Sequence, residues 1–357
     1  MSAQFYKLAI KDIKKETADC VSIAFDIPKE LEQTFAYKSG QYLTIRTFIE
    51  GEEVRRSYSL CSAPYESEWR IAVKKVYEGS FSTYANERLK KGDVIEVMPP
   101  MGSFTFNENS NAQNIVGIAA GSGITPVISL VKAALHQHSS ANVTLVYGNK
   151  NRSSIIFKEE IEALKNKFID RFSVIHILSR EITDAAINTG RIDANKCNDL
   201  FTKHVNINAD AFFICGPEDM TFCVKDFLLE KGVERKRIHF ELFTASQKNR
   251  KNKQRKTTIA NEDAESKITI KQDGIAFNFS LAYDGENILD AALHHGVDLP
   301  FSCKGGVCST CRAKLLEGKI EMETNYALEP EELEKGFILT CQSHPKTQRV
   351  VIDFDAK

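Results

Sequence analysis

The sequence lacks a net charge of either sign. Its 47 lysines and arginines balance 48 aspartates and glutamates across 357 residues, so the formal net charge is −1. A strongly basic chain would attract nucleic acid or an anionic membrane through its overall field, and this chain has no such field. We therefore expect neither nucleic acid nor a membrane as a partner.

A long uninterrupted hydrophobic run is also missing. The longest apolar stretch, residues 115–131, contains three glycines, a proline, two serines and a threonine. Its pattern changes from strand-like to helix-like midway, which argues against a transmembrane helix. The first residues, MSAQFYKLAIKD, lack the apolar core of a secretory signal. We predict a cytoplasmic protein, and structural disulfides are rare in that compartment.

Four of the nine cysteines follow a C-x4-C-x2-C pattern with a fourth member 30 positions later. They are Cys303, Cys308, Cys311 and Cys341. This is the plant-type spacing for four thiolates around a [2Fe–2S] cluster. Gly305 and Gly306 lie between the first two and give the loop the backbone freedom to turn its N–H groups toward the sulfurs.

Zinc is the alternative for these cysteines. Zinc loops usually show two short knuckles of paired ligands, whereas here three cysteines share one loop and the fourth arrives alone. Disulfides are disfavoured by the predicted reducing compartment. The remaining cysteines are scattered, and we expect most to be small buried hydrophobes; they are Cys20, Cys61, Cys197, Cys215 and Cys223.

The length and the local patterns predict three domains. Residues 1–107 contain short runs rich in β-branched and aromatic residues separated by Gly and Pro, which indicates an antiparallel β-barrel. In residues 108–243 strand-like and helix-like runs alternate, as in a parallel sheet covered by helices. Residues 244–266 are almost free of apolar side chains and are predicted to be a flexible linker. Residues 267–357 then form the cluster domain, with an α+β, β-grasp-like fold.

Two strings in the first domain have the chemistry of a flavin site. In Arg56-Ser57-Tyr58-Ser59 a cation, a ring and hydroxyls alternate along a predicted strand. Such groups can bind a phosphate, stack on a fused ring and reach a ring nitrogen. Gly79-Ser80-Phe81-Ser82 precedes a helix-like run whose N-terminus would attract a pyrophosphate. An ordinary serine N-cap is the structural alternative.

These strings resemble motifs of the ferredoxin-NADP reductase family. Its Arg-x-Tyr-Ser motif matches Arg56, Tyr58 and Ser59, and its phosphate turn matches Gly79 to Ser82. A following Val-Lys-Arg stretch of the family matches Val73-Lys74-Lys75. The resemblance implies bound FAD with Tyr58 stacked on the isoalloxazine and Ser59 near N5. It also implies that Arg56 and Ser82 hold the pyrophosphate, with FMN as the alternative cofactor.

Two turns in the second domain point to a nicotinamide dinucleotide. Gly121-Ser122-Gly123-Ile124-Thr125-Pro126 follows an apolar strand and opens a helix, which is the context of a phosphate-binding turn. Pro126 fits the first helical turn, where a missing N–H costs nothing. A purely structural strand-to-helix turn stays open as an alternative. Cys215-Gly216-Pro217 resembles the family's Cys-Gly-Pro motif, whose cysteine lies beside the nicotinamide.

The family resemblance implies further roles in this domain. Cys215, with Ser122 or Thr125, would position the nicotinamide for direct hydride transfer, which needs no acid, base or nucleophile. Ser179-Arg180 matches a Ser-Arg pair that holds a 2′-phosphate, so NADPH is predicted, and Arg152 could assist. Glu241 is close to the place where the family often keeps an acidic residue near the flavin, but we interpret it as a surface glutamate at a strand end. Phe243 is a candidate for shielding the flavin.

The modules follow the order flavin, nicotinamide and ferredoxin along the chain, and this order implies a function. A reductase that takes two electrons from NADPH and delivers them singly through a [2Fe–2S] cluster is similar to the reductases of bacterial oxygenases. The cluster loop is closest to that of the phenylacetyl-CoA epoxidase group, which makes an oxygenase or epoxidase component the expected partner. Reductases of steroid hydroxylases, carnitine oxygenases and acyl desaturases are alternatives. A redox-sensing iron–sulfur flavoprotein is an alternative of another class, as is a nitric-oxide-type detoxifier, although no globin-like region precedes the barrel.

Overall fold

The computed structural model describes residues 4–106, 112–137, 140–243 and 265–356. Contacts divide the chain into two compact units, Tyr6–Phe243 and a second unit that holds Thr244–Lys357 together with Met1–Phe5. Most of the predicted linker, residues 244–264, lies outside the described residues. Each unit is described by itself.

The first part of the larger unit is a six-stranded antiparallel sheet in the order β4-β3-β6-β1-β2-β5. Its strands are β1 (Tyr6–Thr17), β2 (Cys20–Asp26), β3 (Tyr42–Ile49), β4 (Glu52–Ser59), β5 (Trp69–Lys74) and β6 (Val94–Val97). The two edge strands meet through an antiparallel bridge between Leu60 and Ile71, and the Cys61 N–H donates to the Arg70 carbonyl at 2.8 Å. The sheet therefore closes into the predicted barrel. Helix α1 (Ser80–Glu87) buries Phe81 and Ala85 in the barrel core.

A five-stranded parallel sheet in the order β11-β10-β7-β8-β9 forms the rest of this unit. Its strands are β7 (Asn114–Ala120), β8 (Asn142–Asn149), β9 (Phe172–Leu178), β10 (Ala211–Cys215) and β11 (Ile238–Glu241). Its central strands β7 and β10 are apolar runs, as expected for strands covered on both faces. The strand order reverses between β7 and β10, and ligands bind at such switch points in open α/β sheets.

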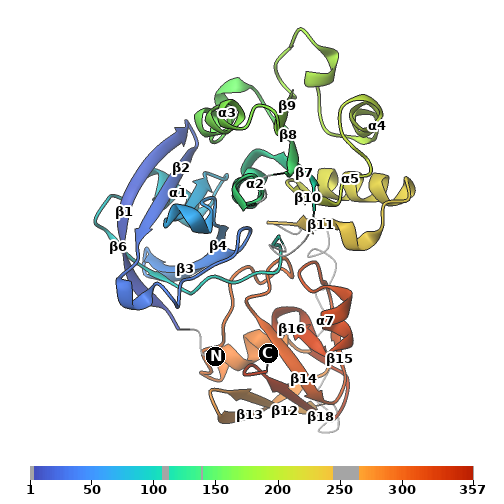
Figure 1. The fold of residues 1–357 in the computed structure, drawn as a ribbon. Helices are drawn as coiled ribbons and strands as arrows, with labels where there is room; N and C mark the ends of the chain where they lie inside the picture. The colour runs from blue at the N-terminus through green and yellow to red at the C-terminus, as the bar shows by residue number, and fades with distance from the viewer. Residues whose placement is uncertain (1–3, 107–111, 138–139, 244–264, 357) are drawn as a thin grey trace. The chain divides into compact units, whose positions relative to one another are not determined.

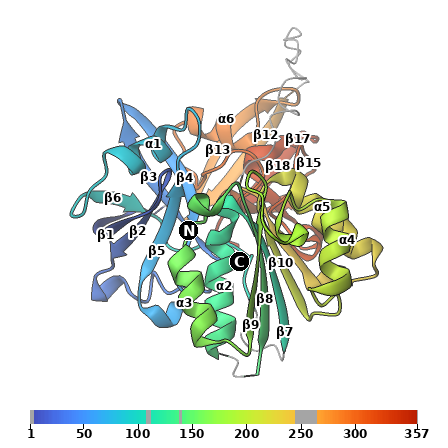
Figure 2. The same ribbon diagram turned by 90° about the horizontal axis from the view of Figure 1, so that it is seen from above.

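Four helices cover the two faces of this sheet. They are α2 (Ile124–Gln137), α3 (Lys158–Lys167), α4 (Ala194–Lys203) and α5 (Glu218–Glu230). Figure 2 shows α2 and α3 on one face and α4 and α5 on the other, and a separate buried cluster lies under each pair. Within the described parts of the chain, no helix is both long and apolar enough to cross a membrane.

The smaller unit has a five-stranded sheet in the order β13-β12-β18-β14-β16 (Figure 1) and a two-stranded sheet of β15 and β17. The strands are β12 (Glu265–Gln272), β13 (Ile275–Ala282), β14 (Arg312–Glu317), β15 (Ile320–Met322), β16 (Phe337–Leu339), β17 (Ser343–Pro345) and β18 (Arg349–Asp353). Alternate residues of β12 are buried, which is the period of a strand with one face on a core. Helix α6 (Ile288–His294) buries Ile288 and Leu289 in that core, and α7 (Pro330–Glu334) is a short surface helix. The predicted α+β fold is confirmed.

Candidate functional site

The predicted flavin strand is β4, which ends at Ser59. Tyr58 and Arg56 project from the same face of this strand, opposite Leu43 and Ile45 of β3. The Tyr58 ring lies 5.4 Å from the ring of Phe81, centroid to centroid, and burial raises the pKa of the Tyr58 hydroxyl. Arg56 is exposed. The barrel thus offers a half-buried aromatic face with a cation two residues away.

The predicted phosphate turn lies at the start of α1, with Gly79 as the N-cap. A Cβ on Gly79 would lie 2.4 Å from Ser82 Oγ, so the turn requires glycine. The Ser82 hydroxyl donates to the Gly79 carbonyl at 3.2 Å and accepts from the Val76 N–H at 3.2 Å. That hydroxyl therefore stabilises the turn itself. An anion at this site would be bound by the N–H groups of the first helical turn.

The three residues of the predicted Val-Lys-Lys stretch have different surroundings. Val73 is fully buried in the barrel core, so only its backbone can reach a cofactor. Lys75 forms an ion pair with Glu87 at the surface. Lys74 has its Nζ 3.8 Å from Asp19 Oδ2 and 3.9 Å from the place where a Cβ on Gly121 would lie. The barrel thus places a cation beside the first glycine of the nucleotide-binding turn.

The two predicted nucleotide turns contact each other at the switch point between β7 and β10. A Cβ on Gly123 would lie 2.0 Å from the Cys215 carbonyl oxygen and 2.8 Å from the Gly216 nitrogen. A Cβ on Gly216 would lie 3.2 Å from the Ala120 nitrogen. The motifs are 92 residues apart in sequence, between Gly123 and Cys215, yet their backbones are in van der Waals contact.

Hydrogen bonds hold the Gly121 turn in place from both sides. The buried Tyr147 of β8 donates its hydroxyl to the Gly121 carbonyl at 3.0 Å. The Thr125 hydroxyl donates to the Ser122 carbonyl at 3.0 Å. Gly121 itself has φ 54°, in the left-handed region that favours glycine. The sequence pattern located this turn, but it contained no signal for the contribution of Tyr147.

Glu241 lies between two of the predicted catalytic residues, Ser59 and Cys215. The Ser59 hydroxyl donates to Glu241 Oε2 at 3.4 Å, and Cys215 is the neighbour of Glu241 in the parallel pairing of β10 with β11. Burial raises the pKa of Glu241 to about 8, against the opposing effect of the Ser59 hydrogen bond. Burial and then Glu241 raise the pKa of the Cys215 thiol.

The interpretation of Glu241 as a surface glutamate is therefore wrong. Its side chain is half-buried, because β11 ends where the barrel strand β4 also ends. The contact joins residues that are 182 positions apart, which no local pattern could reveal. Phe243, the candidate for shielding the flavin, is 38% exposed.

The raised pKa of Glu241 predicts a pH-dependent stability. The unfolded chain loses this proton near pH 4.5, whereas the folded chain retains it to about pH 8. Protonation thus favours the folded state, and stability falls as pH rises through this window. We expect the free energy of unfolding of the flavin-free chain to fall by on the order of 4 kcal/mol between these limits. Glu241→Gln should remove this fall in urea titrations.

The exposed Glu230, at the end of α5, provides a matched control for that measurement. Glu230→Gln removes a carboxyl group at an exposed position, so it separates the effect of the buried Glu241 from that of losing one acidic residue. An identical pH profile for Glu241→Gln and the wild type would show that Glu241 ionises normally in the folded protein.

The predicted 2′-phosphate residues lie where β8 and β9 end. The Ser179 N–H donates to the Asn149 carbonyl at 2.9 Å and the Arg180 N–H to the Lys150 carbonyl at 2.8 Å. The Arg180 side chain is exposed. Arg152, the predicted assistant, is in an ion pair with Glu181, with 3.1 Å between its Nε and Oε1. Arg180 is thus the better placed of the two arginines for an incoming anion.

In the smaller unit the four cluster cysteines form two pairs. The thiols of Cys303 and Cys308 are close enough to shift each other's pKa, and so are those of Cys311 and Cys341. Among the described residues, no group of three or more His, Cys, Asp or Glu side chains could hold a metal ion on its own. Two pairs of sulfurs suit a cluster with two iron atoms better than a single zinc ion.

The loop between these cysteines directs its backbone toward the sulfurs. The Gly305 N–H donates to Cys303 Sγ at 3.3 Å, and the Gln342 side-chain amide donates to Cys341 Sγ at 3.4 Å. The Cys308 thiol and three backbone N–H groups of the loop lower the pKa of Cys303 to about 6, against the effect of burial. These donors favour a thiolate, which is the form that binds iron.

Gly306 is the residue of this loop that has to be glycine. Its φ is 74°, and a Cβ there would lie 2.9 Å from the Thr324 carbonyl oxygen. Its own carbonyl accepts from the Tyr326 N–H at 2.9 Å. Lys304 also has a positive φ, of 48°, and its Nζ donates to Asp290 Oδ1 at 2.6 Å. The loop is thus fixed by contacts with neighbouring segments of the same unit.

The other five cysteines do not form disulfides, and four of them are buried. Burial raises the pKa of Cys20 and of Cys197 to about 12. Cys223 is only half-buried. The expectation that most of these cysteines are buried is confirmed.

The barrel, the parallel sheet with its two interlocked turns, and the cysteine loop define a class of protein, the modular flavin- and iron–sulfur-containing oxidoreductases. Comparison with known families agrees. Residues 7–106 match the oxidoreductase FAD-binding domain, residues 118–226 the oxidoreductase NAD-binding domain, and residues 270–346 the 2Fe-2S iron-sulfur cluster binding domain. FAD, a nicotinamide dinucleotide and a [2Fe–2S] cluster are therefore its cofactors.

Whole-chain relatives narrow the class. The chain is 40% identical over 355 residues to one of the subunits of the 1,2-phenylacetyl-CoA epoxidase of Escherichia coli, covering 99% of this chain and 98% of that protein. It is 35% identical to the ferredoxin reductase component of the 3-ketosteroid-9-alpha-monooxygenase of Rhodococcus rhodochrous, covering 97% and 96% of the two chains. The solved structure of phthalate dioxygenase reductase has the same fold, with a TM-score of 0.60, 23% identity and 98% of each chain covered.

The chain belongs to the family of oxygenase reductase components that combine FAD-binding, NAD-binding and [2Fe–2S] domains. It is an oxidoreductase that supplies electrons to an oxygenase component.

Proposed function

We propose that this reductase transfers electrons from NADPH, through its FAD and its [2Fe–2S] cluster, to the oxygenase component of a phenylacetyl-CoA epoxidase. The electron path from NADPH to FAD rests on one observation. The larger unit brings together the Gly121–Gly123 turn, Cys215 and Ser59. The choice of a phenylacetyl-CoA epoxidase as the acceptor is supported by the 40% identity to a subunit of such an epoxidase over nearly the whole chain.

The residues around Glu241 would bring a nicotinamide and a flavin together. Bound FAD accepts a hydride, and the cluster passes single electrons. Ser59 ends the barrel strand that carries Tyr58, and Cys215 ends the strand before the second nucleotide turn. Because burial raises the pKa of Glu241 to about 8, its carboxyl group can accept the Ser59 hydroxyl without placing a charge at this half-buried position. Direct hydride transfer then depends on position alone.

The remaining predicted cofactor residues fall into two groups, one that would bind FAD and one that would bind the nicotinamide dinucleotide. The FAD side would be bound by Arg56, Ser57, Tyr58 and Ser59, by the backbone of Val73, and by Gly79, Ser80, Phe81 and Ser82 at the start of α1. The nicotinamide side would be bound by Gly121, Ser122, Gly123 and Thr125 and by Cys215, Gly216 and Pro217. Lys74 lies beside Gly121 and can neutralise a phosphate there, whereas Lys75 is already paired with Glu87. Burial of the Phe81 side chain limits its role to supporting Tyr58.

NADPH is proposed over NADH because of the cations beside Ser179. Arg180 and Lys150 are exposed at the adjacent ends of β9 and β8, and a hydrogen bond joins their backbones. An arginine fork suits the 2′-phosphate dianion, and the Ser179 hydroxyl lies at the same strand end. Arg152 is engaged by Glu181 and would contribute less.

Arg180→Ala should selectively weaken the use of NADPH. Hydrogen bonds to charged groups contribute about 1.5–3 kcal/mol, so kcat/KM for NADPH should fall about tenfold or more while that for NADH stays within about twofold. Steady-state reduction of cytochrome c with each nucleotide measures this. Arg88→Ala, which removes an exposed arginine just after α1, is the matched control. Equal losses with NADPH and NADH would refute the assignment.

The identity of the acceptor can be tested by reconstitution. The reductase is combined with NADPH, oxygen, phenylacetyl-CoA and the purified oxygenase subunits of a phenylacetyl-CoA epoxidase, and epoxide formation is measured. The proposal predicts product in proportion to NADPH consumed. Product with a 3-ketosteroid monooxygenase and its substrate, and none with the epoxidase, would move the assignment to that alternative.

The domain boundaries are part of the proposal. We infer a barrel over residues 1–107, a nucleotide domain over 108–243, a tether over 244–266 and a ferredoxin domain over 267–357. The ends of the strands support these boundaries. The barrel's last strand, β6, ends at Val97, and the first strand of the nucleotide domain, β7, begins at Asn114. That domain's last strand, β11, ends at Glu241, and the first strand of the ferredoxin domain, β12, begins at Glu265. The cytoplasm, where NADPH is supplied, is the proposed location.

A further inference from the structure

One face of helix α2 carries three polar side chains toward the barrel. Ser129, Lys132 and His136 occupy positions i, i+3 and i+7 of this helix, which lie on one side of an α-helix. Ser129 is fully buried and Lys132 is 4% exposed, whereas His136 is exposed. Polar residues on a buried stripe require partners, because an unpaired buried polar group is costly.

Each of the three finds its partner in the barrel segment that follows β4. The Ser129 hydroxyl donates to the Ser62 carbonyl at 2.6 Å. Lys132 Nζ donates to the Cys61 carbonyl at 3.1 Å. The rings of His136 and Tyr65 stack with 3.9 Å between their centroids and 10° between their planes. We call this set of contacts, between residues 129–136 and residues 61–66, the α2 clamp.

Lys132 is the charged centre of the α2 clamp. Its Nζ lies 3.2 Å from Oε2 of Glu66 in the barrel and is also paired with Glu160 of α3. Burial alone lowers the pKa of Lys132, but the carboxylates of Glu160 and Glu66 raise it above its usual value. The Glu66 carboxylate also accepts the Ala63 N–H at 2.7 Å. One ammonium group therefore fastens α2, α3 and the barrel segment together.

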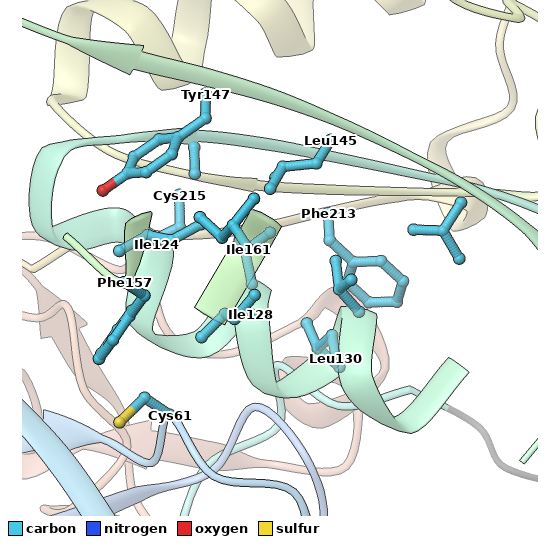
Figure 3. Packing of buried hydrophobic residues seen from close by; sticks show 14 of the residues in the cluster. Cys61, Ile124, Ile128, Leu130, Leu145, Tyr147, Phe157, Ile161, Phe213 and Cys215 are labelled. Atoms are coloured by element: carbon cyan, nitrogen blue, oxygen red, sulfur yellow. The ribbon is translucent and has the colours of Figure 1, made fainter. Parts of the chain in front are cut away.

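Apolar packing surrounds these polar contacts. Cys61 of the barrel segment belongs to the same buried cluster as Ile124 and Ile128 of α2 and Phe157 before α3. Figure 3 shows Cys61 facing the underside of α2 near Ile128 and Phe157. The Lys132 side chain is therefore shielded from water, while its two carboxylate partners keep side-chain exposures of 29% and 36%.

The α2 clamp joins the two segments that immediately follow the two cofactor motifs. Residues 61–66 begin two positions after Ser59, the end of the flavin strand, and α2 begins directly after Gly123 of the nucleotide turn. We propose that the α2 clamp, centred on Lys132, is a positioning element that sets the distance between the flavin and the nicotinamide. This inference rests on the hydride path proposed above.

Small displacements at this junction would have large effects on the hydride step. Hydride transfer requires the reacting atoms about 3–3.5 Å apart, and a displacement of about 1 Å can cost on the order of 100-fold in rate. Ser59 ends a strand of the barrel and Gly123 follows strand β7 of the parallel sheet, and the segment after each of them takes part in the clamp. Loss of Lys132 removes the cation between Glu66 of the barrel and Glu160 of α3, together with the hydrogen bond from α2 to the Cys61 carbonyl. The unpaired carboxylates would repel each other, and α2, which packs in one cluster with residues of α3 and the barrel segment, would shift with them.

The test uses the full-length holoenzyme with Lys132→Met. The rate of flavin reduction at saturating NADPH and the dissociation constant of NADP+ are measured anaerobically, and backbone hydrogen exchange is followed in residues 60–68 and 124–137. We expect the rate to fall about 10- to 100-fold. The dissociation constant should stay within about threefold, because the nucleotide turn itself is intact, and exchange should become faster in both segments together.

Three further variants make the outcome decisive. The triple variant Lys132→Met, Glu66→Gln, Glu160→Gln removes the lysine together with the two carboxylates that it pairs with. It replaces the single variant in these measurements if Lys132→Met does not fold. Lys132→Arg keeps the cation and should recover most of the rate. Lys225→Met removes an ion-paired lysine of α5, outside the junction, and should behave like the wild type.

The proposal would be overturned by a folded Lys132→Met protein that reduces its flavin within twofold of the wild-type rate. It would also be overturned by a slow variant whose exchange rates in residues 60–68 and 124–137 do not change. Failure of NADPH to reduce the wild-type flavin would instead refute the hydride path itself, so the two failures are distinguishable.

Discussion

Gly123→Ala is expected to abolish reduction of the flavin by NADPH, lowering the rate by on the order of 100-fold or more. The added Cβ would lie 2.0 Å from the Cys215 carbonyl oxygen and 2.8 Å from the Gly216 nitrogen. Both are backbone atoms, so no side-chain rotation relieves the overlap. The two nucleotide turns must separate, and both the phosphate-binding turn and Cys215 lose their positions. Stopped-flow absorbance with NADPH measures the loss.

Gly148→Ala is the control for this variant. Gly148 lies in β8 of the same sheet, and its added Cβ would meet Cδ1 of Ile192 at 3.2 Å, the far end of a flexible side chain. It should retain most of the wild-type rate. Chemical reduction by dithionite should proceed normally in both variants, because neither change touches the flavin strand or the cluster loop. A Gly123→Ala protein that NADPH reduces within twofold of the wild-type rate would show that the close contact is not required.

Gly306→Ala should remove most of the [2Fe–2S] cluster. The residue has φ 74°, and its added Cβ would lie 2.9 Å from the Thr324 carbonyl, a backbone atom that the loop cannot avoid. The N–H groups that point toward Cys303 and Cys341 would be displaced together with it. Iron and acid-labile sulfide per chain should fall to a small fraction of the wild-type content, while the FAD content and its reduction by NADPH are retained.

A matched variant at a second glycine of the same unit distinguishes the effect of backbone strain from the effect of steric overlap. Gly274, in the turn between β12 and β13, has the same φ of 74° but nothing within 4 Å of an added Cβ. Gly274→Ala therefore carries only the left-handed penalty of about 1–2 kcal/mol, and it should keep its cluster. Equal loss of iron in the two variants would mean that general destabilisation, and not the contact with Thr324, empties the site.

The cofactor motifs could be predicted from the sequence because each is a short local structure. A strand with alternating groups, a glycine turn before a helix, and three cysteines in one loop all have their essential geometry within about ten residues. The structure places Tyr58 and Ser59 on β4, the Gly121 turn just before α2, and the four cysteines in two pairs within one unit. The alternation of strands and helices likewise predicted the parallel sheet.

The residues that the sequence did not reveal act through long-range contacts. Glu241 meets Ser59 across 182 positions, and Lys132 meets Glu66 across 66. Tyr147 supports Gly121 from a neighbouring strand. Each has an ordinary local context, namely a strand end, a buried helix and a buried strand. The contacts of Glu241 and Lys132 arise only when the barrel and the nucleotide-binding sheet are packed together, and that of Tyr147 only when β8 pairs with β7.

In the proposed path, electrons enter at the Cys215 side of the larger unit and leave through the four-cysteine loop. Anaerobic stopped-flow mixing with NADPH, followed at the flavin and cluster absorbance bands and by electron paramagnetic resonance of frozen samples, tests this path. We expect flavin absorbance to fall first and the signal of a reduced [2Fe–2S] cluster to follow. In Cys341→Ser only the first step should remain. A cluster that stays oxidised in the wild type while the flavin is fully reduced would contradict this electron path.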